Sequence, residues 1–227
     1  MKCRLEIGIH EYYIYSMNNN RLSHEEIRSS LAVYGVSTDD VLCERINTYI
    51  RLFLKWNQKI SLTTVTNPAE ILRFHFGESL FAASVVPIGE SRLADVGSGA
   101  GFPGLAIRLL VELRHLTLID SNAKKVAFLA EVSRELELKN VDVFRGRMEE
   151  FIPIDPGVDF ITARALGQHV QLLQWSHSQL SHSGKIVLWL GEEDCTTIAG
   201  KSAWTWREPI HIPGSTRRFL FVGSPDR

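Results

Sequence analysis

The sequence lacks the features that mark several classes of protein. Its three cysteines are odd in number and share no C-x-x-C spacing, which argues against a disulfide framework and a zinc site. Lysine and arginine number 25 against 26 aspartate and glutamate, so composition gives no pull toward nucleic acid. No apolar run approaches the roughly 20 residues of a membrane span, and the N-terminus MKCRLEIGIHEYY lacks the apolar core of a signal peptide. We therefore expect a cytoplasmic protein with free thiols, no metal and no membrane contact.

Length and apolar content predict one folded unit. The 227 residues, of which 44% are hydrophobic, can fill the core of one α/β domain with an extension. We expect residues 1–90 to form an N-terminal helical extension that packs on a core of residues 91–227, because no linker-like segment separates them. We also expect a monomer. Met17 is a candidate start of the native chain, which the intact mass of the natively expressed protein would test.

The first ninety residues carry helix signals at three places. Ser23 followed by Glu26 forms a capping box, and Gly35 ends that pattern. Apolar residues at helical spacing predict a second helix from about residue 39 to 57. A third helix is expected from Asn67-Pro68, a cap followed by a proline in the first turn, to about residue 86.

From Arg92 onward, β-rich runs alternate with amphipathic stretches. The strand-like runs are RLADVG, LTLID, VDVFRG, VDFITA, KIVLWL and a closing pair near PIHIP and RRFLFVG, and helix-like stretches follow the first, second and fourth. This alternation predicts a doubly wound, Rossmann-like α/β fold with a mostly parallel seven-stranded sheet and helices on both faces. Its ligand crevice should lie at the carboxyl ends of the strands.

The stretch LADVGSGAGFPGLAIRLL, residues 93–110, places four glycines in eight residues between a strand and a helix. Such a loop lets backbone N–H groups approach a ligand at a helix N-terminus. Two registers of the loop compete. In one, Gly99 begins G-x-G-x-x-G and Asp120 follows about 20 residues on, as in a nicotinamide dinucleotide site. In the other, Asp95 ends the strand before G-x-G-x-G, which is the loop of S-adenosylmethionine (SAM) enzymes.

The residues around the loop favour SAM. Pro103 removes an N–H group that a pyrophosphate would need, and SAM has no phosphate. The carboxylate of Asp95 would repel a pyrophosphate but favours the ammonium or sulfonium end of SAM, directly or through water. In both registers Asp120 accepts hydrogen bonds from the ribose hydroxyls. A nicotinamide-dependent oxidoreductase is the rival, and glycines that serve only helix–strand packing are the simplest alternative.

Longer motifs resemble a known family. DVGSGAGFPG followed by LTLIDSNAKKVAFLAEVSRELELKNV is similar to the bacterial RsmG (GidB) family. The likeness extends upstream through KWNQKISLTTV and RFHFGESL, and downstream through GRMEEF, TARAL and HSGKIVLWLG. That family uses SAM to methylate N7 of one guanine in the 530 loop of 16S ribosomal RNA. The resemblance therefore implies a SAM-dependent methyltransferase with this activity, and 16S rRNA or a small-subunit ribosomal particle as its partner.

The expected SAM contacts combine the loop with positions carried over from the family. The resemblance implies contacts at Gly97, Phe102, Met148, Glu149 and Arg164. Together with the loop and the following strand, the predicted cofactor-binding set is Asp95, Gly97, Ser98, Gly99, Gly101, Phe102, Asp120, Met148, Glu149 and Arg164.

Three positions depart from the family pattern. Glu78 stands where aspartate is usual in H-x-x-D-S-L, Ser61 replaces an asparagine, and Leu190 replaces a lysine near the end of the fifth strand. The last change removes a cation from the expected rim of the active site. A non-catalytic SAM- or RNA-binding protein is therefore a further alternative.

The implied reaction needs no general base, because guanine N7 carries an in-plane lone pair and no proton. Methyl transfer is then a direct displacement that depends on alignment, and we name no catalytic residue; His75, Glu78 and Arg164 are candidates near the site. The candidates for RNA contact are basic residues at loop ends and at one helix start: Lys124, Lys125, Arg145, Arg147, Arg217 and Arg218. The alternative function is a SAM-dependent methyltransferase of another RNA or of a small molecule, which the near-neutral charge permits.

Overall fold

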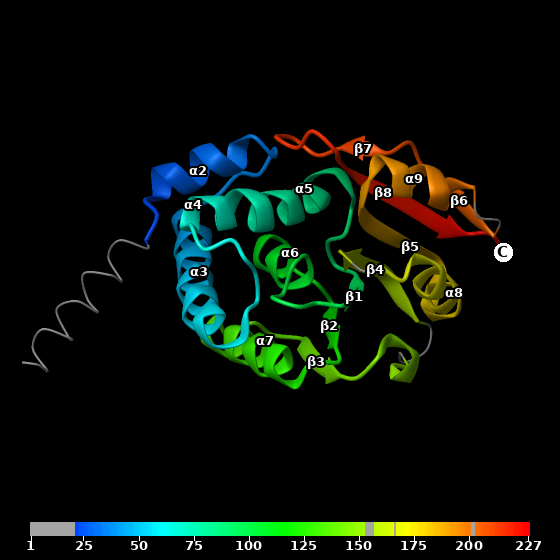
Figure 1. Cartoon of the computed structure of the whole chain (residues 1–227), viewed down its shortest axis with the longest axis horizontal. Helices are drawn as coiled ribbons and strands as arrows, with labels where there is room; N and C mark the ends of the chain where they lie inside the picture. Colours follow the sequence, from blue (N-terminus) through cyan, green and yellow to red (C-terminus); the bar gives the residue numbers. More distant parts are fainter. Residues whose placement is uncertain (1–20, 153–156, 166, 201–202) are drawn as a thin grey trace, which may run out of the picture.

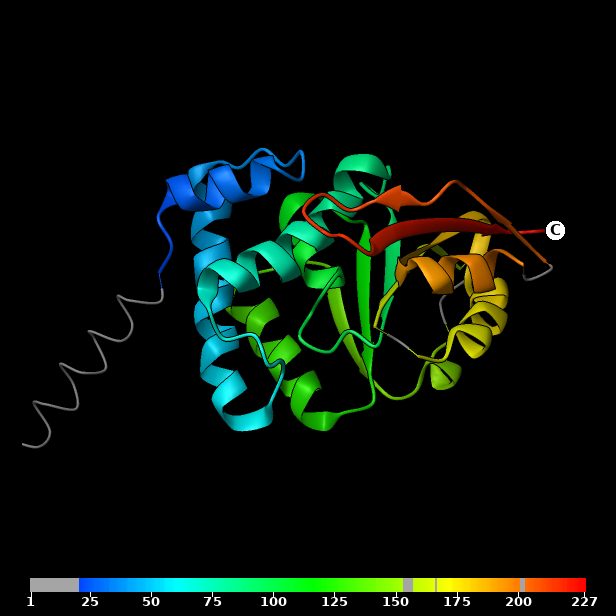
Figure 2. The same cartoon turned by 45° about the horizontal axis from the view of Figure 1, so that its top comes forward.

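The computed structural model describes residues 21–152, 157–165, 167–200 and 203–227, so the candidate start Met17 lies outside the described residues. Helices of the first part of the chain lie on one side of a central sheet, and two later helices lie on the other (Figure 1). Figure 2 shows the same layers from another direction, with the last strand, in red, running toward the C-terminus on the right.

The N-terminal helices begin where the sequence predicts. Helix α2 (His24–Ala32) starts at the capping box, in which the Ser23 N–H donates to Glu26 Oε2 at 2.7 Å. Helix α3 (Asp40–Ile60) ends three residues later than predicted. Its C-cap is Ser61, whose φ of 47° is left-handed. Its apolar stripe contacts α6 and α7.

The third predicted helix is interrupted. Helix α4 (Pro68–Ile71) starts at Asn67 as expected, but a π-helical segment η1 (Leu72–Gly77) separates it from α5 (Glu78–Val85). A Cβ atom on Gly77 would lie 2.2 Å from the ring of Tyr34, so only glycine permits this contact. The π-helical segment presents His75 toward the glycine loop, where its ring stacks on Phe102.

The sheet has the predicted parallel core. Strands β1 (Arg92–Val96), β2 (His115–Asp120), β3 (Val141–Arg145), β4 (Val158–Arg164) and β5 (Leu180–Gly191) pair in parallel in the order β3-β2-β1-β4-β5. The antiparallel strands β8 (Arg218–Pro225) and β6 (Trp204–Trp206) continue this path, which then has seven strands as predicted. The two-residue strand β7 (Ile210–His211) adds an eighth member beside β8.

Helices cover both faces of the sheet. Helices α6 (Gly104–Leu110) and α7 (Ala123–Glu135) share one apolar cluster with the N-terminal helices, whereas α8 (His169–Gln179) and α9 (Glu192–Ala199) pack in a second cluster on the other face. Helix α9 was not predicted, because its sequence EEDCTTIA buries only Cys195 and Ile198 and so has a weak apolar pattern. The carboxyl ends of β1, β2 and β4 meet at one edge, where five of the ten predicted cofactor residues line a cavity.

Candidate cofactor site

A polar cavity of about 570 Å³ lies at the carboxyl ends of β1, β2 and β4, where the doubly wound fold places ligands. Its volume is within the range of small-molecule sites. Its lining combines the glycine loop, the start of α7, the turn after β3 and the end of β4: Val96, Gly97, Ile119, Asp120, Ser121, Asn122, Lys125, Gly146, Arg147, Met148, Glu149, Arg164, Ala165 and Gln168. Five of the predicted SAM contacts therefore meet here, from positions up to 67 residues apart in the sequence.

The glycine loop is fastened to the neighbouring strand. Gly97, Gly99 and Gly101 all have left-handed backbones, with φ of 69°, 56° and 83°. The N–H groups of Gly97 and Ser98 both donate to the Ile119 carbonyl, at 2.9 and 3.1 Å. Ser98 and Gly99 thus hold the loop in shape, and neither they nor Gly101 line the cavity.

Asp120 has the position and the chemistry expected of a ribose acceptor. Its Oδ2 accepts a hydrogen bond from the Gly99 N–H at 2.9 Å, and its Oδ1 accepts one from the Asn122 N–H at 2.8 Å. These backbone donors fix the carboxylate at the cavity wall. Each carboxylate oxygen has a second lone pair, which remains for a vicinal diol.

Asp95 lies behind the loop and does not line the cavity. Its side chain is fully buried, and Oδ1 accepts a hydrogen bond from the Thr162 hydroxyl at 2.7 Å. Burial raises the pKa of Asp95 to about 6, against the opposing effects of the Thr162 hydroxyl and the Gly104 amide. Because a Cβ atom on Gly104 would lie 2.7 Å from the Asp95 Cβ, this carboxylate packs directly under the first turn of α6. Its predicted contact with the cofactor stays a prediction.

Phe102 also lies outside the cavity lining and joins the loop to the N-terminal helices. Its ring, 8% exposed, stacks on Tyr49 with centroids 5.3 Å apart. Phe53 and Phe76 complete the cluster with edge contacts at 6.0 and 5.0 Å. The Tyr49 hydroxyl donates to the Ala100 carbonyl of the loop at 2.7 Å. Tyr49 was missed as a site residue because its spacing marks it only as one more member of the apolar stripe of α3.

The candidates Glu78 and Arg164 form an ion pair at the edge of the cavity. Arg164 Nη2 lies 3.0 Å from Glu78 Oε2, and Arg218 Nη2 lies 2.8 Å from Glu78 Oε1. Burial raises the pKa of Glu78, and the two guanidinium groups act against that rise. Burial also lowers the pKa of His75 to about 4, with Arg164 and Arg218 acting in the same direction, so the imidazole is neutral at neutral pH.

The basic RNA candidates are only partly brought together. Lys125 and Arg147 line the cavity, and Lys124, Arg145, Arg217 and Arg218 do not. The cations at the start of α7 lie beside a strong cap, since Asn122 Oδ1 accepts hydrogen bonds from the N–H groups of both Lys124 and Lys125. A basic rim for RNA therefore stays a prediction.

Leu190, the third departure from the family pattern, points into the second apolar cluster. It is 4% exposed and pairs with Phe219 of β8. The neighbouring pair of the ladder joins Gly191 to Arg218. A cation is therefore present beside the end of β5, on the adjacent strand.

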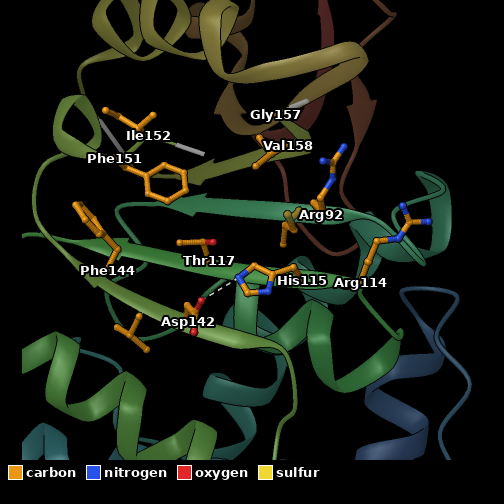
Figure 3. A pocket seen from close by; sticks show the side chains of 12 residues that line it. Arg92, Arg114, His115, Thr117, Asp142, Phe144, Phe151, Ile152, Gly157 and Val158 are labelled. Carbon is orange, nitrogen blue, oxygen red and sulfur yellow. Dashed lines mark ion pairs between the residues drawn. The ribbon is translucent and has the colours of Figure 1, made fainter. Parts of the chain in front are cut away.

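A second hollow, of about 530 Å³, lies at the opposite, amino-terminal end of the strands (Figure 3). His115 and Asp142 form an ion pair on its wall at 3.2 Å, and Phe144 and Phe151 pack edge to face on another side. It is lined by none of the residues predicted for the cofactor or for RNA.

The described residues contain no group of three or more His, Cys, Asp or Glu side chains placed to hold a metal ion. Their helices include none with the length and apolar character needed to cross a membrane. Cys43 and Cys195 are free and buried.

Solved structures with a similar fold include several methyltransferases. A SAM-dependent methyltransferase from Aquifex aeolicus superposes with a TM-score of 0.57 at 17% identity, covering 68% of this chain and 92% of that one. The ribosomal protein L11 methylase of Lactobacillus delbrueckii subsp. bulgaricus gives a TM-score of 0.58 at 14% identity, covering 68% and 80%. At such identities the likeness establishes the fold, which is the predicted one.

Curated relatives match over most of the chain. The ribosomal RNA small subunit methyltransferase G of Escherichia fergusonii is 32% identical over 206 residues, which are 89% of this chain and 98% of the relative. The protein of the same name from Pseudomonas paraeruginosa is 38% identical over 154 residues, covering 67% and 70%. The family model GidB, described as rRNA small subunit methyltransferase G, matches residues 42–208. The prediction of SAM rather than a nicotinamide dinucleotide as cofactor is thereby confirmed, and the chain belongs to the GidB family of methyltransferases.

Proposed function

We propose that this protein transfers a methyl group from SAM to N7 of a single guanine in the 530 loop of 16S rRNA. The observation that carries the proposal is the polar cavity at the strand ends, in which Gly97, Asp120, Met148, Glu149 and Arg164 meet. The names of the relatives support ribosomal RNA of the small subunit as the substrate. The position N7 and the 530 loop rest on the resemblance of the motifs.

The residues present fit the cofactor. Asp120 offers the carboxylate lone pairs that a ribose diol needs, and Gly97, Met148 and Glu149 form the adjoining wall. When bound, SAM supplies an electrophilic methyl group on a positively charged sulfur. The protein then has to hold this group in line with the nucleophile, which is the kind of task that a preformed cavity performs.

Attack by N7 needs no general base, and the candidates His75 and Arg164 are engaged in other contacts. His75 is neutral, but its ring is stacked on Phe102 and its Nε2 lies 3.4 Å from the Thr63 hydroxyl. Arg164 is ion-paired with Glu78, which reduces the repulsion between its charge and the cationic product base. This arrangement suits a reaction that generates positive charge and transfers no proton in the chemical step.

The test is transfer of labelled methyl groups from SAM to 16S rRNA and to small-subunit particles, both from a strain that lacks this methylation. We expect a single N7-methylguanine in the 530 loop, located by mapping the modified base. Methylation of another RNA or of a small molecule would replace the proposed substrate. SAM binding without transfer to any of these substrates would favour a non-catalytic binding protein.

A further inference from the structure

Glu78 is a buried carboxylate held between two arginines from different strands. It begins α5 and is 1% exposed, while Arg164 ends β4 and Arg218 begins β8. Its two oxygens are divided between them, with Oε2 3.0 Å from Arg164 and Oε1 2.8 Å from Arg218. One carboxylate thus joins an N-terminal helix to two strands that flank β5.

The guanidinium group of Arg164 makes its contacts through Nη2, and its Nη1 has no acceptor among the described residues. Its Nη2 also donates to the Phe74 carbonyl at 2.7 Å, so this nitrogen is occupied by the N-terminal segment. Its Nη1 is buried and has no hydrogen-bond partner among the described residues. A buried charged donor without an acceptor is costly, and Arg164 lines the cofactor cavity. The arrangement therefore suits an acceptor that a bound ligand brings.

The charges of the cluster identify the kind of acceptor. Two guanidinium groups share one carboxylate, and within the described part of the chain neither of them has an ion pair with another acidic residue. One positive charge is left over, and around the buried Arg164 an anion is attracted more strongly than in water. Guanidinium groups bind carboxylates and phosphates through paired N–H donors.

We propose that Glu78 and Arg218 are positioning residues that orient Arg164 so that its Nη1 donates to an anionic oxygen of a ligand in the cavity. The inference rests on the proposed function, because it takes this cavity as the cofactor site. Two sources share the required chemistry: the carboxylate of the methionine part of SAM and a phosphate of the RNA. Glu78 is longer by one methylene than the aspartate usual in the family, and here it spans both arginines.

The test is a double-mutant cycle on ligand binding, with the variants Glu78→Gln, Arg164→Met and the two combined. Dissociation constants are measured by calorimetry for SAM and for small-subunit ribosomal RNA. We expect each single variant to raise the dissociation constant of one of these two ligands by about tenfold. A change of this size corresponds to the loss of one charge-assisted hydrogen bond. The double variant should bind no more weakly than Arg164→Met, because Glu78 acts only through that arginine.

The two arms identify the source of the anion. If the losses of SAM affinity are non-additive, and are absent for an S-adenosyl analogue without the carboxylate, then Arg164 binds the carboxylate of SAM. If only the losses of RNA affinity are non-additive, then Arg164 binds a phosphate of the RNA. The proposal would be overturned if, for both ligands, the fold-loss of affinity in the double variant equals the product of the two single losses. It would also be overturned if Glu78→Gln binds both ligands as tightly as the unmodified protein. Since these readouts are binding constants, a failure of the proposed methylation of 16S rRNA would be seen separately, in the transfer assay.

Loss of the buried carboxylate can also destabilise the fold, so Arg218→Gln provides a second cycle with Arg164→Met. The Arg218 side chain is 41% exposed and is less costly to replace.

Asp159→Asn is the matched control: Asp159 forms an ion pair with Arg92 at 3.0 Å near the opposite end of the sheet. That change should lower the temperature of unfolding without changing the affinity for SAM or RNA, whereas both positioning variants should change one affinity at temperatures where they are fully folded.

Discussion

The ring of Phe102 lies almost flat against the imidazole of His75, with centroids 5.1 Å apart and 22° between the planes. The first residue belongs to the glycine loop and the second to the π-helical segment before α5. Their contact, with Tyr49 stacked on Phe102 as well, fastens the cofactor loop to the N-terminal helices.

Removal of the Phe102 ring should destabilise the protein and loosen the loop. We expect Phe102→Ala to lower the free energy of unfolding by about 3–5 kcal/mol, the usual loss for a buried phenylalanine, and to weaken SAM binding. Urea unfolding and calorimetry measure the two effects. Phe144→Ala, in the half-buried ring pair of the second hollow, is the control and should cost less than half as much and leave SAM binding unchanged. Equal effects of both changes would contradict the role given to Phe102.

His75 should make stability depend on pH. Its pKa is about 4 in the folded protein and about 6.5 in the unfolded chain. The unfolded state therefore takes up a proton first as the pH falls. The contribution of neutral His75 to the free energy of unfolding is complete above pH 6.5, and about 3 kcal/mol of it is lost by pH 4. His75→Gln should show a correspondingly shallower loss of unfolding free energy across this interval. Asp95, whose pKa is raised to about 6, contributes with the opposite sign in both proteins and cancels in the comparison. Parallel curves would contradict this assignment.

Asp120 should be required for the adenosine part of the cofactor. In Asp120→Asn only the amide oxygen can accept, so one of the N–H groups of Gly99 and Asn122 loses its acceptor, and so does one ribose hydroxyl. We expect SAM and S-adenosylhomocysteine to bind more weakly by the same factor, about tenfold or more. Calorimetry with both ligands provides the measurement. The control Asp142→Asn, on the exposed ion pair with His115, should leave both affinities unchanged. A loss confined to SAM would argue against the ribose as the group that Asp120 binds.

Ser61 ends α3 in a conformation that suits other residues better. Its φ is 47° and its side chain is exposed. Asparagine tolerates the left-handed region more readily than serine, so Ser61→Asn should stabilise the protein by about 0.5–1 kcal/mol. The midpoint temperature of thermal unfolding should then rise by about 1–4 °C. Ser29→Asn, on the exposed face of α2, should bring no gain, since asparagine is the poorer helix former. A similar gain at both positions would contradict the conformational explanation.

Local signals in the sequence were sufficient for most of the fold. The capping box at Ser23 and the cap at Asn67 give the starts of two helices, and the alternation of strand-like with helix-like stretches gives the parallel sheet. The interruption of the third helix was not predicted. Gly77 ends the π-helical segment and lies against the ring of Tyr34, a contact between distant segments that local spacing does not reveal. Propensity and spacing report on neighbours along the chain and carry no information on such packing.

The candidate site divides in the same way. Gly97 and Asp120 meet because the strand-end rule for doubly wound sheets places them together. The sequence pattern gave no sign that Asp95 would lie behind the loop, bonded to Thr162, although a threonine within the apolar run VDFITA was a polar residue in need of a partner. The ion pair of Glu78 with Arg218 joins residues 140 positions apart, and no local pattern announces it.

The hydrogen bond from the Tyr49 hydroxyl to the Ala100 carbonyl has a consequence for how the chain can be divided. A fragment that starts at residue 91 would keep every glycine of the loop but would lose the phenol that holds it and the rings of Phe53 and Phe76 that cover Phe102. We expect such a fragment to expose this aromatic cluster to water and to bind cofactor poorly. We therefore expect that a graft of this loop onto another methyltransferase would have to carry both α3 and the π-helical segment η1 with it.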